Sequence, residues 1–300
     1  MGKAINALRV SWNCDIYLTG SNSKMLSGDL ATNLAGRYIE FRIQPLSFGE
    51  FNRLYPQENK SETFINYIRF GGMPGLKYFD FQREPIIQYL QGLYDSTVLK
   101  DVVEHNAIRD VDLFSRTTRY AFANIGTTFS ASSIAKFLKN ERRTASVDTI
   151  LDYLEYCSQA FLLDRVNRFD VKGKAAMQTK EKYSCADHGY RLALGLSNES
   201  DIELVLENIV YQELRSRGYE VRVGKVGSKE IDFVAKKDAQ ISYYQVSYLL
   251  ASQETPDREF SVFENVSDNY PKQVLSMDSI DLSRDGIVHK SIIDFLLEWR

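Results

Sequence analysis

The sequence predicts a multidomain protein of mixed α/β and α+β class, on three observations. A buried parallel strand is predicted at 16–19, and it ends in the small polar cluster 20–23, which is typical of ligand-binding α/β sheets. Residues 115–182 follow the order helix, turn, helix and two strands. Residues 197–300 begin with a long helix that three strands follow.

Composition excludes fibrous, collagen-like and disordered proteins. The 300 residues are 44% hydrophobic and 26% charged, which is ordinary for a globular chain of two or three domains. With 37 basic and 40 acidic residues, no overall positive field attracts nucleic acid or anionic lipid. The three cysteines fit neither a disulfide framework nor a metal knuckle, so we expect a cytoplasmic protein. No apolar run approaches the roughly 20 residues of a membrane span, and no signal peptide is apparent.

The first fifty residues carry three motifs in order, TGSNS, LAGRY and PLSFGEF. From Asp15 to Phe51 this segment resembles the second half of the AAA+ ATPase core of a large prokaryotic family. The resemblance implies that residues 1–51 are the C-terminal part of an AAA+ core and that residues 52–114 are its helical lid and linker. It also implies that Asn22 is the sensor-1 residue facing a γ-phosphate and that Arg37 is the arginine finger. An exposed arginine that caps a helix end is the alternative for Arg37.

The phosphate-binding half of such a core is missing from the sequence. The loop GxxxxGK[ST] does not occur, and GSNSK at 20–24 lacks the second glycine and the hydroxyl residue that follows the lysine. No acidic Walker B strand precedes the sensor strand. We therefore expect an N-terminally truncated family member that binds ATP and Mg²⁺ only when an upstream segment or a partner completes it. A trans-acting arginine finger would require a protein partner or a homo-oligomer.

Residues 115–196 have the layout of a winged-helix domain. The stretch 115–182 contains 12 basic and 7 acidic residues, against the net charge of -3 of the whole chain. The second helix could enter the major groove of DNA, with four basic residues on phosphates. These are Arg142, Arg143, Lys172 and Lys174. Winged helices also bind proteins, and Asp148 and Asp152 on the second helix would repel a DNA backbone, so both partners remain open.

Residues 197–300 carry the pattern of a restriction-endonuclease-like domain. Glu207 lies on a helix, Asp232 in the middle of a strand, and Gln245 on the next strand. In such sites two carboxylates and a (D/E)xK motif hold Mg²⁺, which generates hydroxide for phosphodiester cleavage. Here the third motif is Gln245-Val246-Ser247, which lacks both the carboxylate and the lysine. Lys229 or Lys236 could supply the missing ammonium.

Two readings of this domain follow. One is a degenerate scaffold used for binding. The other is a Mg²⁺-dependent nuclease with Glu207 and Asp232 as metal ligands. The phrases ENIVYQEL, KEIDFVA and YYQVSY resemble the same prokaryotic ATPases, so the resemblance extends over nearly the whole chain. The expected function is a truncated AAA+-related protein without autonomous ATP binding, whose C-terminal domains bind DNA or a protein. The nuclease is the alternative.

Overall fold

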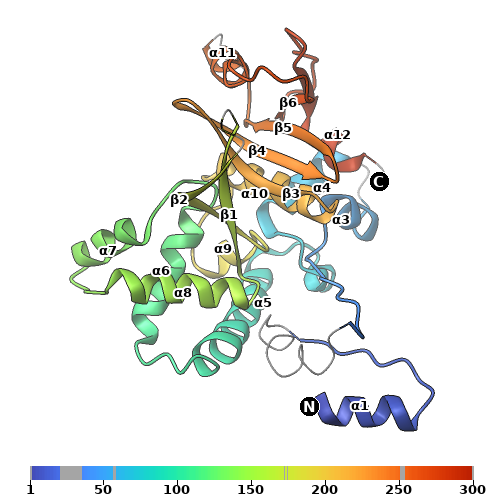
Figure 1. Cartoon of the computed structure of the whole chain (residues 1–300), viewed down its shortest axis with the longest axis vertical. Helices are drawn as coiled ribbons and strands as arrows, with labels where there is room; N and C mark the ends of the chain where they lie inside the picture. The colour runs from blue at the N-terminus through green and yellow to red at the C-terminus, as the bar shows by residue number, and fades with distance from the viewer. Residues whose placement is uncertain are drawn as a thin grey trace.

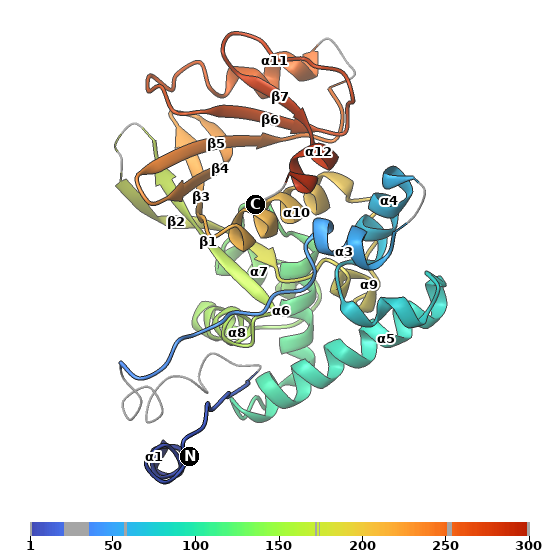
Figure 2. The same ribbon diagram turned by 90° about the vertical axis from the view of Figure 1, so that its right-hand side faces the viewer.

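The computed structural model describes six stretches of the chain, residues 2–20, 36–56, 59–171, 173, 175–250 and 254–298. A seven-stranded mixed sheet carries helices on both of its faces, and a group of helices packs at one end of it (Figures 1 and 2). The predicted mixed α/β class is confirmed, whereas the winged-helix and nuclease-like domains remain predictions.

The N-terminal segment contains one helix, α1 (Gly2–Ser11), which lies apart from the sheet (Figure 1). Residues 12–20 form neither helix nor strand, so the predicted strand at 16–19 is not formed. A parallel strand needs hydrogen-bonding neighbours on the sheet, and no described strand pairs with this stretch. Large apolar side chains stay exposed here, including Val10 at 89%, Tyr17 at 85% and Ile43 at 89%.

The predicted helical middle segment is confirmed. Its elements are α3 (Phe48–Leu54), α4 (Lys60–Phe70), the 3₁₀ helix η2 (Pro74–Tyr78), α5 (Arg83–Ser96) and the π-helix η3 (Thr97–Glu104). α3 begins with a capping box, in which Ser47 accepts from the backbone of Glu50 and the Glu50 carboxylate accepts from Ser47.

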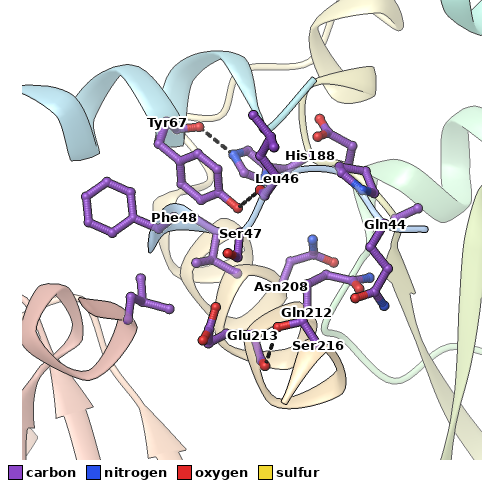
Figure 3. Close-up of a pocket in the computed structure, with 15 residues that line it drawn as sticks. Gln44, Leu46, Ser47, Phe48, Tyr67, His188, Asn208, Gln212, Glu213 and Ser216 are labelled. Atoms are coloured by element: carbon purple, nitrogen blue, oxygen red, sulfur yellow. Dashed lines mark hydrogen bonds between the residues drawn. The ribbon is translucent and has the colours of Figure 1, made fainter. Parts of the chain in front are cut away.

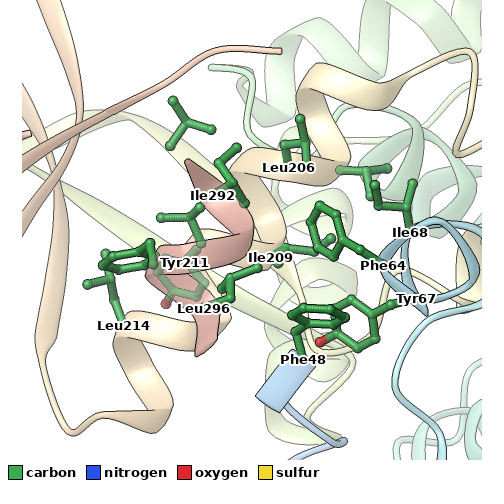
Figure 4. Close-up of a cluster of buried hydrophobic side chains, with 14 of the residues drawn as sticks. Phe48, Phe64, Tyr67, Ile68, Leu206, Ile209, Tyr211, Leu214, Ile292 and Leu296 are labelled. Carbon is green, nitrogen blue, oxygen red and sulfur yellow. The ribbon is translucent and has the colours of Figure 1, made fainter. Parts of the chain in front are cut away.

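These first helices do not form a separate body, because α3 and α4 pack against the helices of the C-terminal part. Phe48 and Phe64 meet Ile209 of α10 (Ile202–Ser216) and Leu296 of α12 (Ile292–Leu297) in one buried cluster (Figure 4). The aromatic rings of Phe48 and Phe64 lie 4.7 Å apart, edge to face. The segment predicted as lid and linker therefore packs against α10 and α12, the helices that cover one face of the sheet.

Three helices build a second core, α6 (Val111–Ala123), α7 (Ala131–Asn140) and α8 (Val147–Gln159). The strands β1 (Leu163–Asp170) and β2 (Ala175–Cys185) follow as an antiparallel hairpin. The predicted order of helices and strands is therefore present. The hairpin expected as a wing, however, is one end of the large sheet, because β1 pairs in parallel with β3 (Glu220–Val226). A boundary between residues 196 and 197 would cut through this sheet.

The C-terminal part matches the predicted helix and strands. After the short α9 (Tyr190–Ala193) come α10, β3, β4 (Lys229–Lys237) and β5 (Gln240–Val246), then α11 (Glu254–Ser261), β6 (Lys272–Ser276), β7 (Val288–Ser291) and α12. The strand order is β2-β1-β3-β4-β5-β6-β7. α10 and α12 cover one face of the sheet, and α11 belongs to the apolar cluster of the other face.

A buried arginine joins the helical and sheet regions. Arg191 of α9 has no exposed surface and donates to the carbonyl of Phe122, to the side chain of Asp201 and to Asn198 Oδ1, the last at 3.0 Å. Asn198 Nδ2 in turn donates to the carbonyl of Ile68 at 3.1 Å. One polar network thus ties α4, α6 and α9 together.

His289 on β7 is buried, with 6% of its surface exposed. Its Nε2 lies 2.9 Å from Ser276 Oγ, and its Nδ1 accepts from the Leu282 amide at 3.3 Å. Burial lowers the pKa of His289, so the ring is neutral in this network at neutral pH.

Candidate functional site

Of the predicted residues, Asp232 lies beside Gln245 and shares an ion-pair cluster with Glu207. Glu207 points from α10, Asp232 stands on β4, and Gln245 stands on the neighbouring β5. Gln245 Oε1 accepts from the Asp232 amide at 3.2 Å, and Asp232 Oδ2 accepts from the Val246 amide at 2.9 Å. The three residues stand on the kinds of element that the sequence predicts, and their role in a site stays a prediction.

A β-bulge in β4 lies beside this site. Arg222 pairs with Val234 and Gly224 pairs with Ile231, so two residues of β4, Asp232 and Phe233, stand opposite one residue of β3. Ile231 and Val234 face the cluster under α11, whereas Phe233 belongs to the cluster under α10. Alternation from Ile231 places Asp232 on the α10 side, and the extra residue keeps Phe233 on that side as well.

Lys182 of β2 places an ammonium group beside Glu207 and Asp232, where the motif Gln245-Val246-Ser247 supplies none. Its Nζ lies 2.8 Å from Glu230 Oε1, 3.5 Å from Glu207 Oε2 and 3.8 Å from Asp232 Oδ1. We call Glu207, Glu230 and Asp232 the carboxylate cluster. Lys182 itself is only 5% exposed.

A second cation also reaches the carboxylate cluster. Arg168 of β1 pairs with Glu230 at 2.7 Å. The site therefore draws on β1, β2, α10 and β4, and two of these strands lie in the stretch that the sequence assigns to the winged helix.

Sequence reasoning missed Lys182 because it looked for a lysine close to Gln245. Lys229 instead donates to the carbonyl of Ser261 at 2.8 Å and pairs with Glu264 at 3.3 Å. Lys236 lines a groove beside Tyr243 and Tyr270, away from the carboxylate cluster. The one signal in the sequence is a lysine on the predicted strand directly before Tyr183, Ser184 and Cys185, residues that the structure shows to be buried.

Burial and mutual repulsion shift the protonation of the carboxylate cluster. Burial, followed by the charge of Asp232, raises the pKa of Glu207 to about 8, although Lys182 opposes the shift. Burial also raises the pKa of Asp232 to about 6, against the effects of Lys182 and of the Val246 amide. Burial lowers the pKa of Lys182, but the three carboxylates outweigh it and raise that pKa above its usual value.

A divalent metal does not fit this arrangement. Lys182 already stands among the oxygens that would bind the ion, and neutral Gln245 replaces the third carboxylate. Gln245 donates from Nε2 to Glu259 Oε2 at 3.0 Å, so both ends of its amide are engaged. Within the described residues, no group of three or more His, Cys, Asp or Glu side chains is placed to hold a metal.

The connection between α6 and α7 closes the site from outside. The Gly126 amide donates to the Tyr183 carbonyl at 2.9 Å, and Thr128 forms a bridge with Lys182. Gly126 has φ +73°, and a Cβ added there would lie 3.0 Å from Glu207 Oε2. The neighbouring cavity has a volume of ≈ 10 Å³, which is about one water in size.

The residues predicted for ATP chemistry form no site in the described structure. Arg37 is exposed in a segment without helix or strand, and Asn22 lies outside the described residues. The end of that segment lies against α10, where Gln44, Leu46 and Asn208 line a small cavity (Figure 3). Its volume of ≈ 20 Å³ suits a water molecule, which needs about 10–15 Å³, and is far too small for a nucleotide. Tyr67 donates to the Leu46 carbonyl at 2.9 Å and fixes this junction.

The residues predicted to contact DNA are divided. Arg142 is exposed at φ +60° after α7, and Arg143 is paired with Asp112 at 2.7 Å. Lys172 and Lys174 lie outside the described residues. Among the described residues, Arg142 therefore forms no described ion pair, whereas the charge of Arg143 is partly neutralised by Asp112.

Comparison with known proteins agrees with the N-terminal motifs. The AAA domain family matches residues 1–52, and a family described as a domain of unknown function (DUF8612) matches residues 61–200. The match to the AAA domain family is confined to these N-terminal residues. No solved structure matches it. Among the described residues, none of the helices combines the length and apolar character that crossing a membrane requires.

Two curated relatives resemble almost the whole chain. An uncharacterized protein of Haemophilus influenzae is 36% identical over 304 residues, covering 99% of this chain and 74% of that protein. The chain belongs to the same family as this Haemophilus protein. An uncharacterized protein of Methanocaldococcus jannaschii is 28% identical over 291 residues, and the chain spans 62% of its length.

Proposed function

We propose that the chain is a component of an AAA-type ATPase-related protein that binds no ATP by itself and whose C-terminal part docks a partner. The observation that carries this proposal is the exposed apolar surface of the AAA-like segment. Trp12 is 66% exposed, Ile39 80% and Phe41 77%, in a stretch that matches the AAA domain family. Apolar side chains of this size are normally buried, so this segment requires further polypeptide to cover it.

ATP binding after completion is the direct test. The isolated chain, titrated with ATP and Mg²⁺ in a calorimeter, should show no binding. Co-expression with the part of the Haemophilus relative that the chain does not span should yield a complex that binds ATP. A double variant, Ile39→Asp with Phe41→Asp, should lose that complex and keep its circular dichroism. Micromolar ATP affinity of the chain alone would contradict the proposal.

For the part of the chain that follows the AAA-like segment, and for the helices α7 and α8 in particular, a protein partner is better supported than DNA. Arg143 is already paired with Asp112, and α8 exposes Asp148 and Asp152, which repel phosphate. DNA binding would fall steeply between about 50 and 200 mM salt and weaken on Arg142→Ala. We expect neither effect for a random duplex.

A Mg²⁺-dependent nuclease centred on Glu207 and Asp232 is the second candidate. The presence of both carboxylates at one cluster favours it, whereas the Lys182 ammonium among their oxygens opposes it. Its test is plasmid cleavage in Mg²⁺ or Mn²⁺, with Asp232→Ala as the control. Cleavage that this variant abolishes would establish the nuclease. Equal cleavage by both proteins would mean that the activity does not come from this site.

A further inference from the structure

We infer that the Lys182 ammonium replaces the divalent cation in the carboxylate cluster, so that the protein itself supplies the positive charge that the layout otherwise takes from a metal. This goes beyond the proposed docking function and does not depend on it. The ammonium is within 3.8 Å of an oxygen from each of the three carboxylates. A magnesium or calcium ion binds oxygens at about 2.0–2.6 Å, so it would have to occupy the same space against a positive charge.

The backbone holds the ammonium in this position. Lys182 pairs across the sheet with Val166 of β1 and bridges to Thr128 on its other side. Its side chain is 7% exposed, so it is largely shielded from solvent. A flexible surface lysine could give way to a metal ion, but this one is fixed by strand pairing and burial.

Two cations of the chain already face the carboxylate cluster. Lys182 lies within 3.8 Å of an oxygen from each of its three carboxylates, and Arg168 pairs with Glu230 at 2.7 Å. Gln245, where nuclease sites of this pattern carry a carboxylate, is neutral. Each departure from that pattern lowers the negative charge available to a divalent cation.

An ammonium group in place of a metal ion also explains how the cluster joins distant elements of the fold. Lys182 lies on β2, Glu207 on α10, and Glu230 and Asp232 on β4, separated by up to 50 positions in the chain. In a metal site the ion would join such elements. Here the ion pairs do so directly, and the sheet edge remains attached to α10 in the absence of any metal.

Mn²⁺ binding by matched variants tests the inference. The probe is Mn²⁺ alone, followed by calorimetry and by thermal unfolding of the full chain. Wild type should show no saturable binding up to a few millimolar. Lys182→Gln, which removes the charge at similar length, should bind Mn²⁺ with a Kd of about 0.1–1 mM, in the range of weak oxygen-ligand sites. Its melting temperature should rise with Mn²⁺.

Two controls separate the charge from the contacts. Lys182→Arg retains a cation and should behave as wild type towards Mn²⁺. Lys229→Gln removes a lysine that pairs with Glu264, outside the carboxylate cluster, and should gain no binding.

Two results would overturn the inference. One is wild-type Mn²⁺ binding that Asp232→Asn abolishes. The other is a folded Lys182→Gln protein that binds no Mn²⁺. If that variant does not fold, nuclear magnetic resonance of wild type decides: Mn²⁺ should not selectively broaden the Val246 amide signal, which hydrogen-bonds Asp232, and selective broadening refutes the inference. None of these results depends on ATP or on a docking partner.

Discussion

Replacing Glu207 by Gln should change how the stability of the protein depends on pH. The pKa of Glu207 rises from the ordinary value of 4.5 to about 8 in the folded protein. A raised folded-state pKa means that the folded state binds the proton more tightly than the unfolded state. The stability from this group is therefore complete below about pH 4.5 and is lost as the pH rises through about 8.

The magnitude follows from the size of this shift. One pKa unit corresponds to about 1.4 kcal/mol, so the wild type should lose about 3–4 kcal/mol of stability from Glu207 between about pH 5 and 8. The variant carries no titrating group at this position and avoids that loss. The pKa of about 8 already includes the attraction between the ionised carboxylate and Lys182. We therefore expect the stability of the variant relative to wild type to rise by about 3–4 kcal/mol over this range.

Urea unfolding followed by circular dichroism at several pH values, at constant ionic strength, measures this difference. Glu203→Gln is the matched control, since Glu203 lies on the same helix but is exposed. Its unfolding free energy should run parallel to that of wild type. If Glu207→Gln also runs parallel to wild type from about pH 5 to 8, Glu207 does not titrate in this range and our electrostatic description of the cluster is wrong.

Three further predictions concern the frame of the site. Arg191→Met should lower the unfolding free energy measured in urea by about 3–5 kcal/mol, because the Phe122 carbonyl, Asn198 and Asp201 lose their donor. Arg119→Met, at an exposed arginine, should lower it by less than about 1 kcal/mol. Similar losses in the two variants would refute the buried network. Gly126→Ala should lower the melting temperature more than Gly195→Ala, since both have positive φ but only the first meets a carboxylate; equal losses would contradict this. His289→Gln should reduce the stability that the protein loses below about pH 6.5. Burial lowers the pKa of His289 in the folded state, so wild type becomes less stable as the unfolded state takes up the proton more readily. If wild type and variant lose the same unfolding free energy between about pH 7 and 5, this prediction is wrong.

The helices and the C-terminal strands were predictable because their signals are local. The caps Ser47, Ser130 and Ser146 begin α3, α7 and α8 as their side-chain chemistry requires. Glu207, Asp232 and Gln245 could be assigned to one site because a helix followed by a β-meander brings those positions together. Chain spacing alone was enough for this part.

The wing was misplaced for a physical reason. A hairpin pattern shows that two strands pair with each other, but not which third strand lies at their side. The parallel pairing of β1 with β3 joins residues about 55 positions apart, such as Arg168 and Val223, and no local pattern marks it. The predicted strand at 16–19 failed for the related reason that a strand forms only where neighbours accept its hydrogen bonds.

The sequence by itself determined the resemblance of the N-terminal residues to an AAA domain, the order of helices and strands from α3 onward, and the absence of the GxxxxGK[ST] loop, because these depend on residue types at short spacing. Only the tertiary structure decided the character of the carboxylate cluster. Lys182 enters it through the pairing of β2 with β1 and of β1 with β3, which brings its Nζ to 3.8 Å from Asp232 Oδ1. Electrostatic energy depends on distance in space rather than along the chain, so the cation of this site became visible only in the folded protein.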